Sequence, residues 1–367
     1  MKPHVHKTPL HDRHLKAKAR MVDFAGWSMP VQYAGILEEH RHVRSACGLF
    51  DLTHMGEFIL TGPQAVSDTN RLITNDLAAI HANQCVYSPM CHDQGGIVDD
   101  LIAYRYADGH MMLVVNASNR EKDLAWVKAH VSPSTEVVDR SFEMALLALQ
   151  GPKTLDVLGP YVPGLEGIKS YHFLETKVLG HQVIVSRTGY TGEDGYEIYC
   201  ENEAAIPLWD LFIGDARVAP IGLGARDTLR FEARLMLYGN DLDEQTTPLE
   251  AGLAWTVKLD KPAFVGREAL LKQRDAGLSR KLVGFRMLGR GIARHGHELR
   301  AGGEKIGHVS SGSFSPTLDA NLGLGYVKPE FTAAGTKFAV RIRNQDVEAE
   351  VVKTPFYKRP GSEKKKD

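Results

Sequence analysis

A pair of neighbouring carboxylates is the sharpest chemical feature of the sequence. Asp99 and Asp100 follow Gly95-Gly96 in the string GGIVDDLI, a pattern typical of a turn that leads into a strand. Successive side chains on a strand point to opposite faces, so the two acids are expected to meet different surroundings. A carboxylate held in a pocket or core has its pKa moved by burial or by its partners, as acid–base catalysis requires. The spacing leaves open which acid does so, and the alternative is that one caps a turn or pairs with a buried arginine.

A glycine-rich segment is the second candidate. Residues 187–197 read RTGYTGEDGYE, and three glycines let the backbone pass close to a ligand or to another chain segment. Tyr190 has the flat ring that stacks on a planar ligand, and Glu197 accepts hydrogen bonds from ring or amide donors. The alternative interpretation is a structural hairpin with Asp194-Gly195 as its turn.

An arginine near a helix start is the third candidate. Arg226 lies in the string GARDTLR at residues 224–230, where the helix dipole favours acidic residues instead. This placement predicts a partner anion, either Glu197 or the carboxylate of a ligand. An internal salt bridge explains the placement equally well.

The elements that must position these side chains mix helices with strands. Apolar periodicity predicts helices over 33–46, 64–75, 119–130, 225–237 and 267–274, and strands over 49–60, 111–116 and 143–149. Ser118 with Glu121 fits a capping box at the start of the third helix. The stretch 182–200 predicts a strand, a loop and a second strand. Without a regular βαβ rhythm, this part of the chain is expected to be α+β.

A boundary is predicted at 276–280, a short polar link that contains a glycine. Beyond it, short β-rich runs alternate with turn signals, which indicates a small β-barrel or sandwich. The final residues, 361–367, are charged and are expected to be disordered.

Composition excludes several classes of protein. The 367 residues carry 44 Lys+Arg and 45 Asp+Glu, so a dedicated nucleic-acid binder is not expected. No apolar run approaches the roughly 18 residues of a membrane span, and no secretory signal is recognised, so neither membrane nor export is expected. Four cysteines without a C-x-x-C pair predict reduced thiols and a cytoplasmic location. Sixteen histidines show no zinc spacing, so no metal is expected, and P-loop, G-x-G-x-x-G and G-x-S-x-G strings are absent from the sequence.

Taken together, these strings resemble the aminomethyltransferase, or T-protein, family of the glycine cleavage system. The resemblance covers nearly the whole chain and keeps the family's order. The strings that carry it are KTPL at 7–10, FAGW at 24–27, FDLTHMG at 50–56, GGIVDDLI at 95–102, Asn116 with REKDL at 120–124, ALQGP at 148–152, 188–198, 224–230, LYGN at 237–240, SGSFSP at 311–316 and Pro355-Phe356.

The resemblance implies a three-domain, cloverleaf-like folate-binding fold that ends in a β-barrel. The folate-binding region, two interleaved α+β domains, is expected over 7–275 and the barrel over 281–360. The implied reaction releases ammonia from an aminomethyl group on the lipoyl arm of the H protein and passes the one-carbon unit to tetrahydrofolate. The expected partners are therefore lipoylated H protein and tetrahydrofolate as co-substrate.

The resemblance also selects Asp100 as the functional carboxylate. Its implied role is to hydrogen-bond the folate near the reacting nitrogens, where it orients the nucleophile, assists proton transfer and stabilises cationic character. The positions implied to line the folate pocket are Met55, Tyr87, Asn116, Tyr190, Glu197 and Arg226. Some family members meet the folate's glutamate with a residue shortly after Pro-Phe, and here Lys358 and Arg359 are both candidates.

Related functions lack their own signatures in this sequence. Folate-binding proteins of iron–sulfur maturation carry the string KGCYxGQE, whereas the equivalent stretch here, PAFVGRE at 262–268, has no cysteine. Dimethylglycine and sarcosine dehydrogenases carry an added flavin domain, which is missing here. A non-catalytic folate-binding or scaffold protein is the remaining alternative, and Asp100 within a complete pocket set favours an enzyme.

Overall fold

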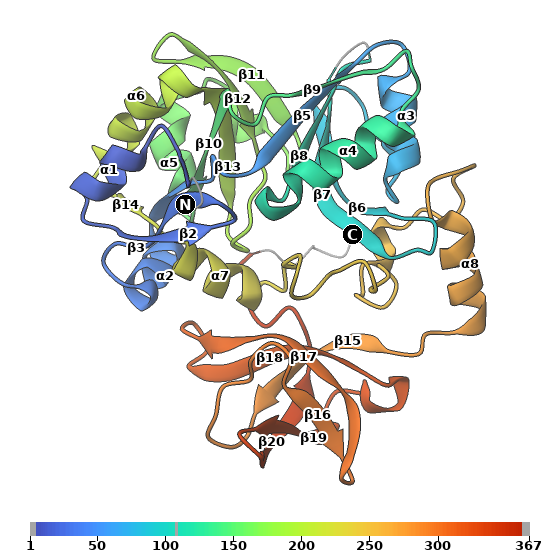
Figure 1. Cartoon of the computed structure of the whole chain (residues 1–367). Helices are drawn as coiled ribbons and strands as arrows, with labels where there is room; N and C mark the ends of the chain where they lie inside the picture. The colour runs from blue at the N-terminus through green and yellow to red at the C-terminus, as the bar shows by residue number, and fades with distance from the viewer. Residues whose placement is uncertain (1–4, 107–108, 362–367) are drawn as a thin grey trace. The chain divides into compact units, whose positions relative to one another are not determined.

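A computed structural model describes residues 5–106 and 109–361, and the chain divides into two compact units. Unit 1 consists of Met1–Ser88 and Asp99–Asp227, and unit 2 of Pro89–Val98 and Thr228–Asp367. Helices and mainly antiparallel sheets alternate irregularly along unit 1 (Figure 1). The predicted α+β class is confirmed.

A six-stranded sheet forms the larger core of unit 1. Its order is β11-β12-β13-β10-β4-β14, with bounds Phe173–Val178, His181–Ser186, Gly195–Glu201, Met144–Gln150, Cys47–Asp51 and Val218–Pro220. The central strand β10, MALLALQ, is buried at every position, as expected for a strand covered on both faces. Helices α5 (Thr154–Leu158) and α6 (Asn202–Ile213) pack against it.

A five-stranded sheet carries the carboxylate pair. Its order is β6-β7-β8-β5-β9, with bounds Gln84–Cys91, Ile97–Arg105, Met111–Val115, Gly56–Thr61 and Glu136–Asp139. Helices α3 (Ala65–Leu72) and α4 (Arg120–His130) pack on this sheet and on each other. Figure 1 shows both helices lying along the sheet.

The rest of unit 1 comprises a small sheet and short helices. The sheet has the order β1-β3-β2, with bounds His6–Lys7, Trp27–Gln32 and Arg20–Phe24, and lies near α1 (His11–Lys16) and α2 (Ile36–Ser45) in the sequence. The 3₁₀ turns of the unit are η1 (Leu77–Ala79), η2 (Ala117–Asn119), η3 (Gly159–Tyr161) and η4 (Leu165–Gly167). Helix α7 (Leu223–Glu232) begins in unit 1 and ends in unit 2.

Unit 2 contains the predicted barrel. Its closed order is β15-β18-β17-β16-β19-β20, with bounds Lys281–Met287, Ala320–Val327, Glu304–Ser315, Glu298–Ala301, Lys337–Ile342 and Gln345–Val352. Phe285 is fully buried in the barrel core, against the backbone of Gly323, where an added Cβ would lie 2.1 Å from the ring. Helix α8 (Arg267–Ala276) and the 3₁₀ turns η5 (Ala254–Thr256) and η6 (Pro329–Phe331) complete the unit. The prediction of a C-terminal β-barrel is confirmed.

Three predictions about element boundaries are wrong for physical reasons. The helix expected over 225–237 ends at Glu232, because Arg234 adopts a left-handed conformation with φ of 56° that no α-helix can continue. The capping box at Ser118 does not form: Ser118 lies in η2, α4 begins after Asn119, and no side chain caps that end. The predicted strand 49–60 is also divided, since a turn at 52–55 separates β4 from β5.

The other predicted helices and the strand–loop–strand at 182–200 lie where expected, within a few residues. The division into domains at 7–275 and 281–360 and their cloverleaf arrangement stay predictions. The predicted tail lies outside the described residues, except for Gly361. Within residues 5–106 and 109–361, no helix is long and apolar enough to cross a membrane, and no group of three His, Cys, Asp or Glu could hold a metal ion.

Candidate functional site

Asp100 lies on β7 with its carboxylate held by two donors. The hydroxyl of Tyr87, on β6, donates to Oδ2 over 2.9 Å. The side-chain amide of Asn116, which follows β8, donates to Oδ1 over 3.0 Å. Strand β6 and the end of β8, the neighbours of β7 in one sheet, thus supply two residues that are 13 and 16 positions from Asp100 in the sequence.

The environment of Asp100 makes it titrate near neutral pH. Burial, together with the charge of Asp99, raises the pKa of Asp100 to about 7, against the opposing effect of the bonds from Tyr87 and Asn116. Both forms of the carboxyl group are therefore populated at neutral pH. A group with such a pKa, at hydrogen-bonding range of a substrate, can take up or release a proton.

Asp99 points to the opposite face of β7, as the alternation of a strand predicts. It is fully buried and accepts hydrogen bonds from the backbone N–H of Asn116 over 3.0 Å, from the Asn116 amide over 2.8 Å, and from the Asn119 amide over 2.7 Å. The Asn116 amide therefore contacts both carboxylates. The different surroundings expected for the two acids are confirmed, with Asn116 as the residue they share.

Glu197 lies on the other sheet and is linked to β7 through two tyrosines. The hydroxyls of Tyr104 and Tyr199 share a hydrogen bond of 2.9 Å, and each tyrosine lies on the same face of its strand as the nearby acid. Asp100, Tyr104, Glu197 and Tyr199 thus belong to strand faces that meet in unit 1. Glu197 is buried and accepts hydrogen bonds from Thr188 and Tyr199, and burial raises its pKa.

Arg226 and Tyr190 form the third part of the site. The Arg226 guanidinium carbon lies 4.5 Å from the centre of the Tyr190 ring, a cation–π distance. Its positive charge opposes the rise in the pKa of Glu197, and the choice of Glu197 or a ligand carboxylate as the partner anion of Arg226 stays a prediction. Burial, followed by the charge of Arg226, lowers the pKa of His54 to about 3, so this imidazole is neutral beside the arginine.

The residues expected in the site divide into four groups. Tyr87, Asp100 and Asn116 are joined by hydrogen bonds, and Tyr190, Glu197 and Arg226 by the cation–π contact and charge. Met55 lies in the turn between β4 and β5 and is partly buried. Lys358 is exposed and Arg359 half-buried, both in unit 2, so their part in the site stays a prediction.

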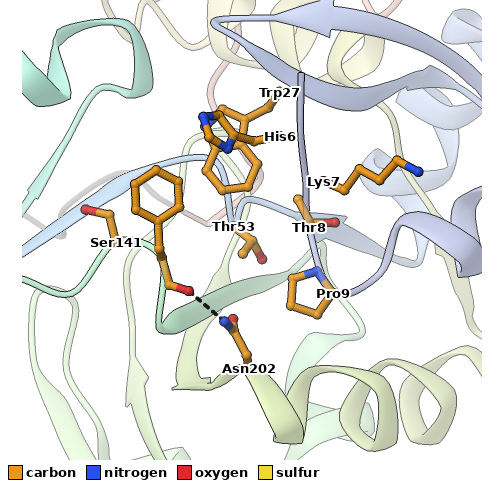
Figure 2. A pocket seen from close by; sticks show the side chains of 9 residues that line it. His6, Lys7, Thr8, Pro9, Trp27, Thr53, Ser141 and Asn202 are labelled. Carbon is orange, nitrogen blue, oxygen red and sulfur yellow. Dashed lines mark hydrogen bonds between the residues drawn. The ribbon is translucent and has the colours of Figure 1, made fainter. Parts of the chain in front are cut away.

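A separate pocket of about 240 Å³ opens near the N-terminal strand of unit 1. Figure 2 shows its lining side chains, with the Asn202 amide donating to the Phe142 carbonyl over 2.8 Å. The rings of Trp27 and Phe142 stack with centroids 5.6 Å apart. The full lining consists of His6, Lys7, Thr8, Pro9, Trp27, Thr53, Ser141, Phe142 and Asn202. Since none of the residues expected in the site lines this pocket, it is distinct from the Asp100 constellation.

Sequence reasoning missed several residues around Asp100. Tyr104 carried a usable signal, because a residue four positions along a strand shares the face of Asp100. Asn119, which directly precedes α4, and Asp123, in the first turn of α4, are one helical turn apart, a spacing that predicts a shared face. Nothing in the sequence indicated that this face meets Asp99.

Comparisons with known proteins show the family of the chain. The model of the GCVT N-terminal domain matches residues 10–261, and that of the glycine cleavage T-protein C-terminal barrel domain matches residues 280–358. Curated proteins called aminomethyltransferase are similar over almost their whole length. The relative from Halothermothrix orenii is 49% identical, with 95% of this chain and 99% of the relative covered. The relative from Rubrobacter xylanophilus is 52% identical, with 96% and 94% covered.

A solved structure is similar as well. The aminomethyltransferase T of the glycine cleavage system from Bartonella henselae superposes with a TM-score of 0.92 at 36% identity, and 97% of this chain and 99% of that chain are covered. An α+β region followed by a closed barrel, matched over almost the whole chain by aminomethyltransferases, identifies the chain as a group-transfer enzyme. The chain belongs to the glycine cleavage T-protein family, the aminomethyltransferases.

Proposed function

We propose that this enzyme transfers the one-carbon unit from the aminomethyl-lipoyl arm of the H protein to tetrahydrofolate. The carbon loses its bonds to the lipoyl sulfur and to the amino nitrogen, and gains bonds to two folate nitrogens. The two protons that leave those nitrogens go to sulfur and to ammonia. The products are dihydrolipoyl H protein, ammonia and 5,10-methylenetetrahydrofolate, with no change in oxidation state.

Asp100 is the residue that carries this proposal. Its carboxylate is fixed by Tyr87 and Asn116, and its pKa of about 7 lets it exist in either charge state. As a carboxylate it orients the attacking nitrogen, accepts the proton released there and stabilises positive charge on the transferred carbon. The fixed donors reduce the reorganisation needed during the reaction.

The surrounding side chains fit the chemistry of a folate. A pterin is flat and carries ring N–H and amino donors, for which the buried carboxylate of Glu197 is a suitable acceptor. His54 Nδ1 and both carboxylate oxygens of Glu57 are buried without a hydrogen-bond partner among the described residues. Tyr87 and Tyr190 offer aromatic surfaces, and Met55 an adaptable apolar one. We assign the folate glutamate to Lys358 or Arg359.

The partner and location follow from the same proposal. A lipoylated H protein and an anionic folate need only local basic groups, which agrees with the net charge of −1. Cys47, Cys85, Cys91 and Cys200 are all buried free thiols. Such thiols support a reducing compartment, the cytoplasm.

The direct experiment measures ammonia release from aminomethylated H protein with and without tetrahydrofolate. We expect release that depends on the folate. Asp100→Asn should keep folate binding while turnover falls by about 100-fold or more, because the amide cannot accept the proton. Asp93→Asn changes an exposed acid on the connection that leads from β6 into β7; it is the matched control and should retain full turnover. Full activity of Asp100→Asn would refute the role of Asp100, and folate binding without ammonia release by the unmodified protein would indicate a non-catalytic binder.

A further inference from the structure

Besides Asp99, another buried acid lies behind Asp100, on the other face of β7. Asp123 belongs to α4, one turn after Asn119, and its side chain is fully buried. Neither of its carboxylate oxygens receives an N–H or O–H hydrogen bond from the residues that the structure describes. Its polar contact is with another acid, since the carboxyl groups of Asp123 and Asp99 are within hydrogen-bonding range when one carries a proton.

The donors around this pair decide where the proton lies. Among the residues that the structure describes, Asp99 receives three N–H hydrogen bonds, from the backbone and amide of Asn116 and from the amide of Asn119, whereas Asp123 receives none. An ionised carboxylate buried without donors is strongly disfavoured, and two adjacent buried carboxylates cannot both ionise at neutral pH. The proton therefore belongs on Asp123, which then donates to Asp99.

The electrostatics agree with the hydrogen-bond pattern. Burial, followed by the charge and contact of Asp99, raises the pKa of Asp123 to about 11. The charges of Asp99 and Asp100 on β7 raise the pKa of Asp123, and the charge of Lys122, its neighbour on α4, lowers it.

Asp99 is linked to Asp100 through the side-chain amide of Asn116. The Nδ2 atom of Asn116 donates one hydrogen to Asp99 over 2.8 Å and one to Asp100 over 3.0 Å. If the amide rotated by half a turn, its oxygen would face both carboxylates, so Asp99 fixes the orientation of Asn116. The charge of Asp99 also contributes to the raised pKa of Asp100.

We propose that Asp123 is a positioning residue, a protonated acid that holds Asp99 as the single charged member of a buried pair and so orients Asn116 against Asp100. This proposal rests on the proposed function only where its test measures kcat; the titration part of the test does not depend on it. It extends the set of residues on which the reaction depends to α4, behind the sheet and away from the face that carries Asp100.

The test combines a titration with kinetics. The carboxyl groups of ¹³C-labelled aspartates are titrated by NMR in the unmodified protein, Asp123→Asn, Asp123→Ala and Asp100→Asn, the last to assign Asp100. The asparagine imitates a neutral, donating acid, so the pKa of Asp100 should stay within about 0.3 units of the unmodified value. The alanine removes the donor, and kcat should fall by about tenfold or more with the KM for tetrahydrofolate nearly unchanged, while asparagine restores kcat.

Three results would overturn the proposal. A fall of about one unit in the pKa of Asp100 in Asp123→Asn would show that Asp123 is charged in the native protein. Equal loss of kcat in the asparagine and alanine variants, or no loss in either, would contradict a positioning role. If alanine prevents folding, the titration of the asparagine variant still decides the protonation state. Absence of turnover in the unmodified protein would refute the proposed function, and the titration would still report on the pair.

Discussion

At the scale of single residues, Asp100 is a partly buried carboxyl group with a proposed catalytic role, and this combination predicts how activity depends on pH. The carboxylate is the form that accepts the proton, so kcat/KM should rise with pH and level off above the pKa of about 7. A pH–rate profile with saturating H protein checks this. In Asp100→Asn, kcat/KM should be low and should no longer rise with pH. A profile that is flat between pH 6 and 8 in the unmodified protein would exclude Asp100 as the titrating group.

The same group affects stability with a definite sign. The pKa of Asp100 is raised in the folded chain from the ordinary value of 3.8 to about 7, so the fold disfavours the charged form. Its contribution to stability is fully present below pH 3.8 and is lost as pH rises through 7. Asp100→Asn should therefore gain in free energy of unfolding more at pH 8.5 than at pH 5, as measured by urea unfolding. An equal gain at both pH values would contradict the raised pKa.

Arg226 supports a separate prediction at this scale. Its guanidinium stacks on Tyr190 and its charge acts on Glu197. Arg226→Ala should weaken tetrahydrofolate affinity by about tenfold, and Arg226→Lys should recover only part of it, because an ammonium lacks the planar stacking surface. Binding is followed by quenching of protein fluorescence. Unchanged affinity in the alanine variant would mean that the contact with Tyr190 is purely structural.

Local pattern predicted only some of this site. A strand at Asp99-Asp100 and its alternation could be read from the sequence, because strand periodicity is a property of the chain itself. The convergence of Tyr87, Asn116 and Asp123 on that strand depends on sheet order and helix packing. No spacing in the sequence encodes those contacts, so the choice of Asp100 over Asp99 came from family resemblance.

At the scale of elements, the close pairing of β13 with β10 sets the position of Glu197. Ala148 pairs with Glu197 and Gln150 with Gly195, and a Cβ on Gly195 would lie 2.4 Å from Gln150 Nε2 and 2.6 Å from the Leu149 carbonyl. Glycine at this position is required by close approach rather than by a turn. The hairpin interpretation explained Gly195 by a turn, whereas the structure explains it by the close approach of β10.

This close approach can be tested by adding one methyl group. Gly195→Ala should destabilise unit 1 by about 1–3 kcal/mol through overpacking, and it should weaken folate affinity by displacing Glu197. Gly167→Ala is the control, since a Cβ there meets nothing within 4 Å. Thermal unfolding and folate titration of both variants provide the comparison. A Gly195→Ala protein with normal stability and affinity would show that β13 adjusts without cost.

At the scale of the whole molecule, buried polar contacts join the barrel to the segment before it within unit 2. Asp241 accepts hydrogen bonds from Arg230 and from Ser310, each over 2.6 Å, and Glu232 accepts from Ser315 over 2.6 Å. The apolar runs beyond residue 280 were enough to predict the barrel. The contacts of Asp241 and Glu232 were not predictable, because they pair single polar residues about 70 to 80 positions apart.

The ion pair of Arg230 with Asp241 gives the last prediction. Their side chains are 3% and 0% exposed, so neither charge has water to replace a lost partner. Asp241→Ala should lower the free energy of unfolding by about 3–5 kcal/mol, because it leaves the guanidinium buried and uncompensated. Asp346→Ala removes the partner of Arg341 in an ion pair whose side chains are 34% and 42% exposed, and should cost at most about 1 kcal/mol. Urea unfolding of both variants measures the difference. If the two losses were equal, contacts through Asp241 would not be what holds residues 228–250 to the barrel.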